Sequence, residues 1–304
     1  MNNTVILSGT ASNGAAEGIS KFLRLPLITV ESRLLADGES YVRIPEDLSG
    51  KNVVIVQSAY PPQDKHLIEL FLLLDAAKSF NPNRIILVVP YLAYARQNKR
   101  FNEGEPISVE AILKIIRYMG ADFIITVEPH RSESLKAFTG GTLIIDPIPA
   151  FARSVSKEFK NPVVLAPDNG AIKRAERLAD MLKADHTHLN KERDKTSGEV
   201  TLKNESKYDF GGRDVIIIDD IISTGGTVVN AAKFAKNNNA GRIFAIAAHL
   251  IMTDGCYDRL KEAGISEIMG SNTVPSRNAK IVDLSQAIAE GVSAALKELD
   301  LVRP

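Results

Sequence analysis

The segment of this chain with the clearest capacity for chemistry is V-I-I-I-D-D-I-I-S-T-G-G-T, from Val215 to Thr227. An apolar run leads into two adjacent acids, Asp219 and Asp220, and then into a short turn, with a helix expected from about Val228. Glycines let the backbone of such a turn bring several N–H groups against one anion, and the helix that follows adds the positive end of its dipole. The pattern predicts a cradle for a phosphate monoester. The carboxylates beside it can accept hydrogen bonds from sugar hydroxyls or hold a hydrated Mg²⁺.

A strand, a glycine turn and a capped helix without any ligand would share part of this pattern. We disfavour that alternative because two carboxylates so close to a core are costly unless something compensates their charge.

Short apolar, β-branched runs that alternate with stretches of helical periodicity predict the elements that position this turn. Continuous apolar strands between helices imply parallel sheets that are covered on both faces. The predicted fold class is therefore α/β, with mostly parallel sheets flanked by helices. The runs lie at Val53–Val56, Ile85–Val89, Phe123–Val127, Val163–Leu165, Val215–Ile218 and Ile243–Ala247, and helical stretches include Leu67–Lys78 and Ile172–Leu182.

The chain also repeats itself. G-K-N before the run at Val53–Val56 resembles G-R-D before the run at Val215–Ile218, and each run leads to a helix that carries A-A-K. Upstream, S-N-G-A at Ser12–Ala15 has a counterpart in D-N-G-A at Asp168–Ala171. Correspondences in the same order predict two tandem α/β units.

We expect one domain over 1–146, with a terminal helix in 284–304 packing back on it, and a second domain over 147–283. The two copies differ where their central strands end, because the first has Gln57-Ser58 in the place of Asp219-Asp220. The acidic, glycine-rich chemistry is therefore expected only in the second domain.

Composition limits the partners. Lysine plus arginine and aspartate plus glutamate each number 37, so no net charge attracts nucleic acid or an anionic membrane. The single cysteine, Cys256, rules out an internal disulfide framework and suits a reducing compartment. No leader sequence or membrane-spanning run is evident, and we expect a cytoplasmic protein.

The phosphate turn resembles the phosphoribosyl diphosphate-binding motif shared by type I phosphoribosyltransferases and ribose-phosphate diphosphokinases. The resemblance implies two tandem phosphoribosyltransferase-like domains, with Asp219 and Asp220 facing the ribose hydroxyls. It also implies that the 5-phosphate of ribose 5-phosphate is bound by Ser223, Thr224, Gly225, Gly226 and Thr227.

Two further segments favour the diphosphokinase over the transferase. Leu35–Glu39 resembles the diphosphokinase segment that contacts the adenine of ATP, and Pro90–Gln97 resembles another ATP-contacting segment that follows a buried strand. An arginine suits phosphate oxygens because its planar fork can bind them in bidentate fashion. The resemblance implies ATP contacts by Asp37, Gly38, Glu39, Arg96, Gln97 and Lys99.

The same resemblance implies a metal site and a flap. His130, in T-V-E-P-H, and Asp168, in P-D-N-G, correspond to residues that bind Mg²⁺ in the family. In the stretch from Lys191 to Lys207, Lys191 and Arg193 correspond to residues that reach over the reacting phosphate, and Arg193 also to a ribose 5-phosphate contact.

The resemblance implies transfer of a diphosphate from ATP to the anomeric hydroxyl of ribose 5-phosphate, which gives 5-phosphoribosyl 1-diphosphate and AMP. Lys191 and Arg193 would neutralise charge on the transferred group, and Asp220 would orient or help deprotonate the hydroxyl. The family also implies a homo-oligomer with the ATP site at a subunit interface. Two alternatives remain open: a phosphoribosyltransferase, and a regulatory partner that keeps the fold without turnover.

Overall fold

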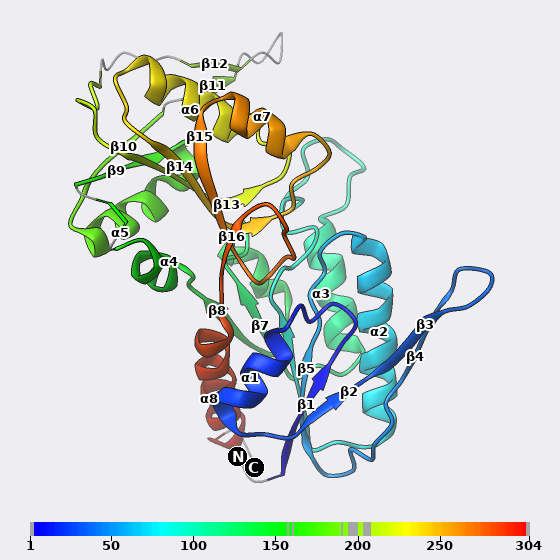
Figure 1. Cartoon of the computed structure of the whole chain (residues 1–304). Helices are drawn as coiled ribbons and strands as arrows, with labels where there is room; N and C mark the ends of the chain where they lie inside the picture. Colours follow the sequence, from blue (N-terminus) through cyan, green and yellow to red (C-terminus); the bar gives the residue numbers. More distant parts are fainter. Residues whose placement is uncertain are drawn as a thin grey trace. The chain divides into compact units, whose positions relative to one another are not determined.

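The computed structural model describes residues 3–156, 158–159, 161–189, 191–193, 200–202 and 208–301, and it describes no side chain within 190–207. The chain forms two compact units (Figure 1). Unit 1 comprises Met1–Asp146, Asn272–Val274 and Asp283–Pro304, and unit 2 comprises Pro147–Ser271 and Pro275–Val282.

Unit 1 is built on a six-stranded parallel sheet with the order β2-β1-β5-β6-β7-β8. Most of its central strand residues are buried, as their runs of valine and isoleucine predict for a sheet covered on both faces. The strands are β1 Thr4–Ser8, β2 Leu27–Thr29, β5 Asn52–Val56, β6 Arg84–Val89, β7 Phe123–Val127 and β8 Gly141–Ile145.

Unit 2 repeats this topology. Its six-stranded parallel sheet has the order β10-β9-β13-β14-β15-β16, so each strand has a counterpart at the same place in unit 1. The predicted α/β class with two similar units is confirmed. The strands are β9 Val163–Ala166, β10 Asp185–His188, β13 Val215–Ile222, β14 Ile243–Leu250, β15 Ile265–Ser271 and β16 Lys280–Val282.

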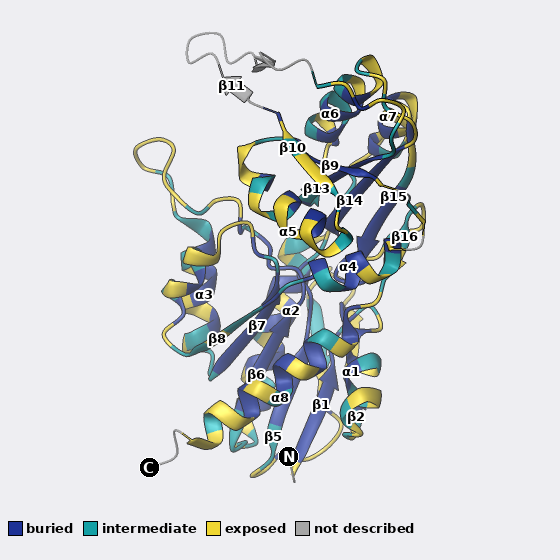
Figure 2. Ribbon diagram, turned by 90° about the vertical axis from the view of Figure 1, so that its left-hand side faces the viewer, coloured by how far each residue is buried: buried dark blue, intermediate teal, exposed yellow. Residues whose placement is uncertain are grey.

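Helices cover the sheets, and their outer faces are exposed (Figure 2). In unit 2, helices α4 and α5 pack over one face of the sheet, and α6 and α7 pack over the other. The helices of unit 2 are α4 Ile148–Val155, α5 Ile172–Leu182, α6 Gly226–Asn237 and α7 Cys256–Glu262, with a 3₁₀ turn η2 at Asn169–Ala171.

In unit 1 the last helix of the chain contacts the first helix and the strands β7 and β8. The described part of this helix, α8, packs beside α1, where a Cβ on Gly18 would lie 2.2 Å from the Oγ of Ser285. The helices of unit 1 are α1 Ala15–Leu23, α2 Gln63–Ser79, α3 Ser108–Tyr118 and α8 Ser285–Leu301, with a 3₁₀ turn η1 at Ser132–Ala137.

Two antiparallel strand pairs lie outside the main sheets: β3 Glu31–Leu34 with β4 Ser40–Arg43, and β11 Lys191–Arg193 with β12 Val200–Leu202. Within the described ranges, no helix combines the length and the apolar character that crossing a membrane requires.

Candidate active site

The predicted phosphate turn lies in unit 2 between β13 and α6. Helix α6 begins at Gly226, slightly earlier than expected, and Gly225 before it has a φ of 81°. Glycine adopts this left-handed conformation without strain, whereas a Cβ disfavours it. A Cβ at this position would also lie 3.0 Å from the Sγ of Cys256 on α7. Backbone conformation and close packing therefore both require glycine here.

Two carbonyl groups of the turn are held from behind. The backbone N–H of Thr253 donates to the carbonyl oxygen of Ser223 at 3.1 Å, and the Nη2 of Arg259 donates to that of Thr224 at 2.9 Å. In a trans peptide the N–H points opposite to the C=O. The N–H groups of Thr224 and Gly225 therefore point away from these partners, which is the orientation that an anion-binding turn needs.

Asp219 and Asp220 lie inside β13, whereas the sequence predicted them at the end of the strand. The strand continues because Ile221 and Ile222 pair with His249 and Leu250 of β14. The strand also changes face at the acids. In a regular strand, residues an odd number of positions apart point to opposite faces of the sheet. Ile217 and Ile222 have such a spacing, yet both pack in the same core cluster.

The charge of the Asp219 carboxylate is only partly compensated by the groups around it. Its Oδ1 accepts the backbone N–H of Asp220 at 2.9 Å and lies 3.6 Å from the Nη1 of Arg174 on α5. Burial, followed by the neighbouring Asp220 carboxylate, raises the pKa of Asp219 well above its usual value, although Arg174 acts in the opposite direction. The charged form of Asp219 is thus disfavoured by its surroundings.

A third acid, Asp168, belongs to the same region. It directly precedes η2, and its Oδ1 accepts the N–H of Gly170 at 2.9 Å. Its charge makes the smallest of the contributions that raise the pKa of Asp219. β9 and β13 are the neighbours at which the strand order reverses, and open α/β sheets bind ligands beyond the carboxyl ends of such strands.

The first predicted ATP segment, in unit 1, forms the tip of the β3–β4 hairpin. Leu35 closes the turn, since its N–H donates to the carbonyl of Glu39 at 2.8 Å. Gly38 has a φ of 91°, and the Glu39 N–H donates to the Oδ1 of Asp37 at 3.3 Å. Asp37 and Glu39 are both exposed at this tip, where they can contact a ligand.

The second predicted ATP segment follows β6. The side chains of Arg96, Gln97 and Lys99 are exposed. The Oγ of Ser108, the first residue of α3, donates to the Oε1 of Gln97, and the Lys99 ammonium lies 5.1 Å from the centre of the Phe101 ring. The hairpin tip and this loop both belong to unit 1.

The remaining predicted residues are described in part. His130 lies shortly after β7 in unit 1 and is exposed, and Asp168 belongs to unit 2. Lys191 and Arg193 lie in β11, but their side chains are outside what the structure describes. Among the described residues, no group of three or more histidine, cysteine or acidic side chains has the arrangement of a metal site.

Sequence reasoning missed two arginines that act on the site. Arg174 looked like one of several charges on the polar face of an amphipathic helix, and only the fold brings it to Asp219. Arg259 lies far along the chain from the phosphate turn and reaches Thr224 because α7 packs behind that turn. Neither spacing nor residue type distinguished these two from surface arginines.

Comparisons with known proteins cover both units. A model of the N-terminal domain of ribose phosphate pyrophosphokinase matches residues 4–120, and a model of the phosphoribosyl synthetase-associated domain matches residues 204–299. Ribose-phosphate pyrophosphokinase of Sulfurisphaera tokodaii is 45% identical over 95% of this chain and 100% of its own length. That of Sulfolobus acidocaldarius is 47% identical over the same shares.

A solved structure agrees with these sequence matches. Phosphoribosylpyrophosphate synthetase from Mycobacterium smegmatis superposes with a TM-score of 0.87 at 26% identity, and the alignment covers 98% of this chain and 100% of that one. The relatives match along nearly the whole chain, and the two family models include both predicted ATP segments and the phosphate turn. The chain belongs to the ribose-phosphate pyrophosphokinase family.

Proposed function

We propose that this ribose-phosphate pyrophosphokinase binds ribose 5-phosphate in unit 2 and ATP through the hairpin tip and the loop after β6 in unit 1. The activity of the chain is the synthesis of 5-phosphoribosyl 1-diphosphate from ATP and ribose 5-phosphate. This family assignment favours the synthetase over the phosphoribosyltransferase that the phosphate turn alone left open. The observation that carries the proposed sugar site is the phosphate turn itself, with two carbonyls held away and acids beside it.

Each part of the sugar site has a role that its chemistry supports. The backbone N–H groups and hydroxyls of the turn bind the 5-phosphate, and the N-terminal end of α6 adds its dipole. Asp219 and Asp220 accept hydrogen bonds from ribose hydroxyls, and Asp220 orients the anomeric hydroxyl. The binding residues are Ser223, Thr224, Gly225, Gly226 and Thr227.

The transfer requires alignment and charge neutralisation more than covalent assistance from the protein. The anomeric oxygen forms a bond to the β-phosphorus of ATP and gives up its proton with the help of Asp220. The bond between that phosphorus and the bridging α-phosphate oxygen breaks, and AMP leaves with the bonding pair. Lys191 and Arg193 stabilise charge on the transferred group, and Arg193 also binds ribose 5-phosphate. On the ATP side, the proposed contacts are Asp37, Gly38, Glu39, Arg96, Gln97 and Lys99.

Mg²⁺ is the cation that the family generally uses. We propose His130 and Asp168 as its protein ligands. Besides burial, Asp220 and Asp168 both raise the pKa of Asp219, and a cation bound in this region would favour the charged forms of these acids. Bound Mg²⁺ would neutralise phosphate oxygens while keeping several of its waters, so few protein ligands are expected.

We also propose that the two units are the two domains, with Asn272–Val274 assigned to the first.

We further propose that the protein is a homo-oligomer with ATP sites at a subunit interface. Apolar side chains on the hairpin and on α2 support the oligomer, because large exposed apolar groups favour protein contacts. Four such residues are Leu34, Leu35, Ile68 and Leu72, which are 57, 39, 51 and 39% exposed. A cytoplasmic location stays a prediction.

The test is a ³¹P NMR assay of the full chain with ATP, ribose 5-phosphate and Mg²⁺, run beside Lys191→Ala and the control Lys233→Ala, an exposed lysine on α6. We expect AMP and a pyrophosphoryl sugar from the parent protein and the control. Turnover of Lys191→Ala should fall by on the order of 10²-fold, as expected when one charge that stabilises the transition state is removed.

Equal turnover by both variants would remove Lys191 from the mechanism. Folded protein that binds ribose 5-phosphate without making AMP would support the regulatory alternative instead.

A further inference from the structure

The place in unit 1 that corresponds to the sugar site of unit 2 is filled by the protein's own side chains. In both sheets the strand order reverses between two neighbours, β9 and β13 in unit 2 and β1 and β5 in unit 1. Gln57, which follows β5, is fully buried. A Cβ added to Gly9 would lie only 2.2 Å from the Oε1 of Gln57. Gln57 therefore packs directly against the backbone of Gly9.

The turn into the next helix differs between the two units as well. Helix α2, the counterpart of α6, is preceded by Pro61 and Pro62, whereas α6 is preceded by Gly225 and begins at Gly226. Proline has no backbone N–H, so these residues cannot donate to an anion.

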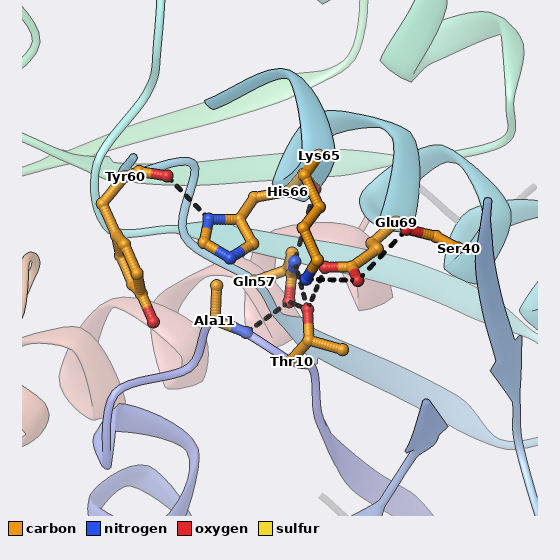
Figure 3. A network of polar contacts seen from close by, with 8 residues as sticks. All are labelled: Thr10, Ala11, Ser40, Gln57, Tyr60, Lys65, His66 and Glu69. Carbon is orange, nitrogen blue, oxygen red and sulfur yellow. Dashed lines mark hydrogen bonds and ion pairs between the residues drawn. The ribbon is translucent and has the colours of Figure 1, made fainter. Parts of the chain in front are cut away.

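A chain of hydrogen bonds occupies this place instead (Figure 3). Gln57 accepts the N–H of Ala11 at 3.0 Å and donates through Nε2 to the Oγ1 of Thr10 at 2.9 Å. Thr10 in turn donates to the Oε2 of Glu69 at 2.5 Å. Glu69, on α2, is only 3% exposed.

Glu69 is held from a second side as well. Its Oε1 lies 2.7 Å from the Nζ of Lys65, one helical turn earlier, and accepts the Oγ of Ser40 at 3.4 Å. A buried carboxylate needs such compensation, and here an ammonium group and two hydroxyls provide it. Ser40 is the first residue of β4 and directly follows the hairpin tip Asp37–Glu39, so Glu69 holds the base of that tip (Figure 3).

The same helix holds the second ATP segment. Asp64, in the first turn of α2, accepts the hydroxyl of Tyr94 at 2.5 Å through its Oδ1, and this hydrogen bond raises the pKa of Tyr94. Tyr94 is two positions before Arg96 in the loop after β6. Tyr91, earlier in this segment, is held from outside α2, because its N–H donates to the Oγ of Ser58, just after β5, at 3.0 Å.

We propose that Asp64 and Glu69 of α2 are positioning residues that hold the two ATP-contact segments in fixed relation to each other. The proposal rests on the assignment of Asp37–Glu39 and Arg96–Gln97 to ATP. Helix α2, which lost the phosphate cradle of its counterpart, thus organises the nucleotide site. These residues act through Ser40 and Tyr94 and do not themselves touch ATP.

The test compares Michaelis constants for both substrates in Glu69→Gln, Ser40→Ala, Asp64→Asn and Tyr94→Phe. The control is Asp75→Asn, an exposed acid further along the same helix. Loss of one positioning hydrogen bond should raise the KM for ATP by about two- to tenfold. The KM for ribose 5-phosphate should stay within about twofold of the parent value, because unit 2 keeps its own contacts. Asp75→Asn should change neither constant.

Double variants separate positioning from general stability. If Asp64 acts through Tyr94, Asp64→Asn with Tyr94→Phe should raise the KM for ATP no more than either single change does. Ser40→Ala and Tyr94→Phe each remove only a hydroxyl, so they keep the test informative if the buried Glu69→Gln variant fails to fold. An unchanged KM for ATP in folded Ser40→Ala and Tyr94→Phe, or equal rises for both substrates, would overturn the proposal.

Arg96→Ala distinguishes this outcome from failure of the proposed ATP site. If Arg96→Ala raises the KM for ATP while the α2 variants do not, the positioning role alone is wrong. If Arg96→Ala has no effect either, the assignment of that segment to ATP is wrong, and the positioning role is wrong with it.

Discussion

Replacing Gly225 by alanine tests the architecture of the phosphate turn directly. The φ of 81° costs an L-residue about 1–2 kcal/mol relative to glycine. The new Cβ would also lie 3.0 Å from the Sγ of Cys256 and 3.4 Å from the Cδ2 of Leu260. Crowding of a packed site typically costs about 1–3 kcal/mol, so the free energy of unfolding of unit 2 should fall by about 2–5 kcal/mol.

A matched control separates the two contributions. Gly212 in the same unit has a φ of 76°, and nothing lies within 4 Å of the Cβ that it would carry. Gly212→Ala should therefore lose only the conformational part, about 1–2 kcal/mol. Combining Gly225→Ala with Cys256→Ala removes the crowded sulfur, and in that background the change at Gly225 should cost little more than Gly212→Ala.

Urea unfolding and initial-rate kinetics provide the measurements. Because the crowded methyl group should shift the backbone of the turn proposed to bind the 5-phosphate, Gly225→Ala should raise the KM for ribose 5-phosphate by about tenfold or more. The KM for ATP should be nearly unchanged. If Gly225→Ala were no less stable than Gly212→Ala and kept the parent KM for ribose 5-phosphate, neither the packing argument nor the anion cradle would stand.

Three further predictions concern the acids, the arginine behind the turn and the oligomer. The pKa of Asp219 is higher in the folded protein than its unfolded value of about 3.9. Its contribution to stability is therefore fully present below the unfolded pKa and is lost as the pH rises through the folded pKa. Asp219→Asn should therefore melt above the parent protein at about pH 8, with an advantage that shrinks toward about pH 4 in thermal unfolding scans. Arg259→Gln should raise the KM for ribose 5-phosphate by about tenfold without changing that for ATP, and Arg259→Lys should restore part of the loss in steady-state kinetics. Ile68→Glu should shift sedimentation toward a smaller species, whereas Phe22→Glu, at a side chain of similar exposure on α1, should not; equal behaviour would exclude α2 from the interface.

Local sequence patterns were sufficient for the fold class. The valine- and isoleucine-rich runs became buried strands, and the helix predicted over Ile172–Leu182 has those bounds. The internal repeat predicted the organisation of the chain as two similar units, which no single apolar run could do, because two copies of one sequence pattern are expected to share one topology. The matching strand orders of the two sheets confirm that reasoning.

The sequence was less informative wherever the outcome depends on contacts between distant segments. The apolar run before Asp219 ends at Ile218, but β13 continues to Ile222 because β14 is long enough to pair with it. The positions of Arg174 and Arg259 likewise depend on how helices pack against the sheet. A pattern of spacing within one segment carries no information about such partners.

The two units show how one fold can keep or lose a ligand site without changing its topology. Burial and the neighbouring Asp220 carboxylate raise the pKa of Asp219 although an arginine lies 3.6 Å away, so its charged form is disfavoured unless a cation or a hydroxyl donor binds to it. In unit 1 the buried carboxylate, Glu69, is already compensated by Lys65 and Thr10. A ligand gains little by replacing contacts that the protein already makes for itself, whereas it gains much where the protein leaves charge uncompensated. We therefore propose that the difference in charge compensation between Asp219 and Glu69, more than the fold itself, distinguishes the sugar site proposed in unit 2 from the support for the nucleotide segments proposed in unit 1.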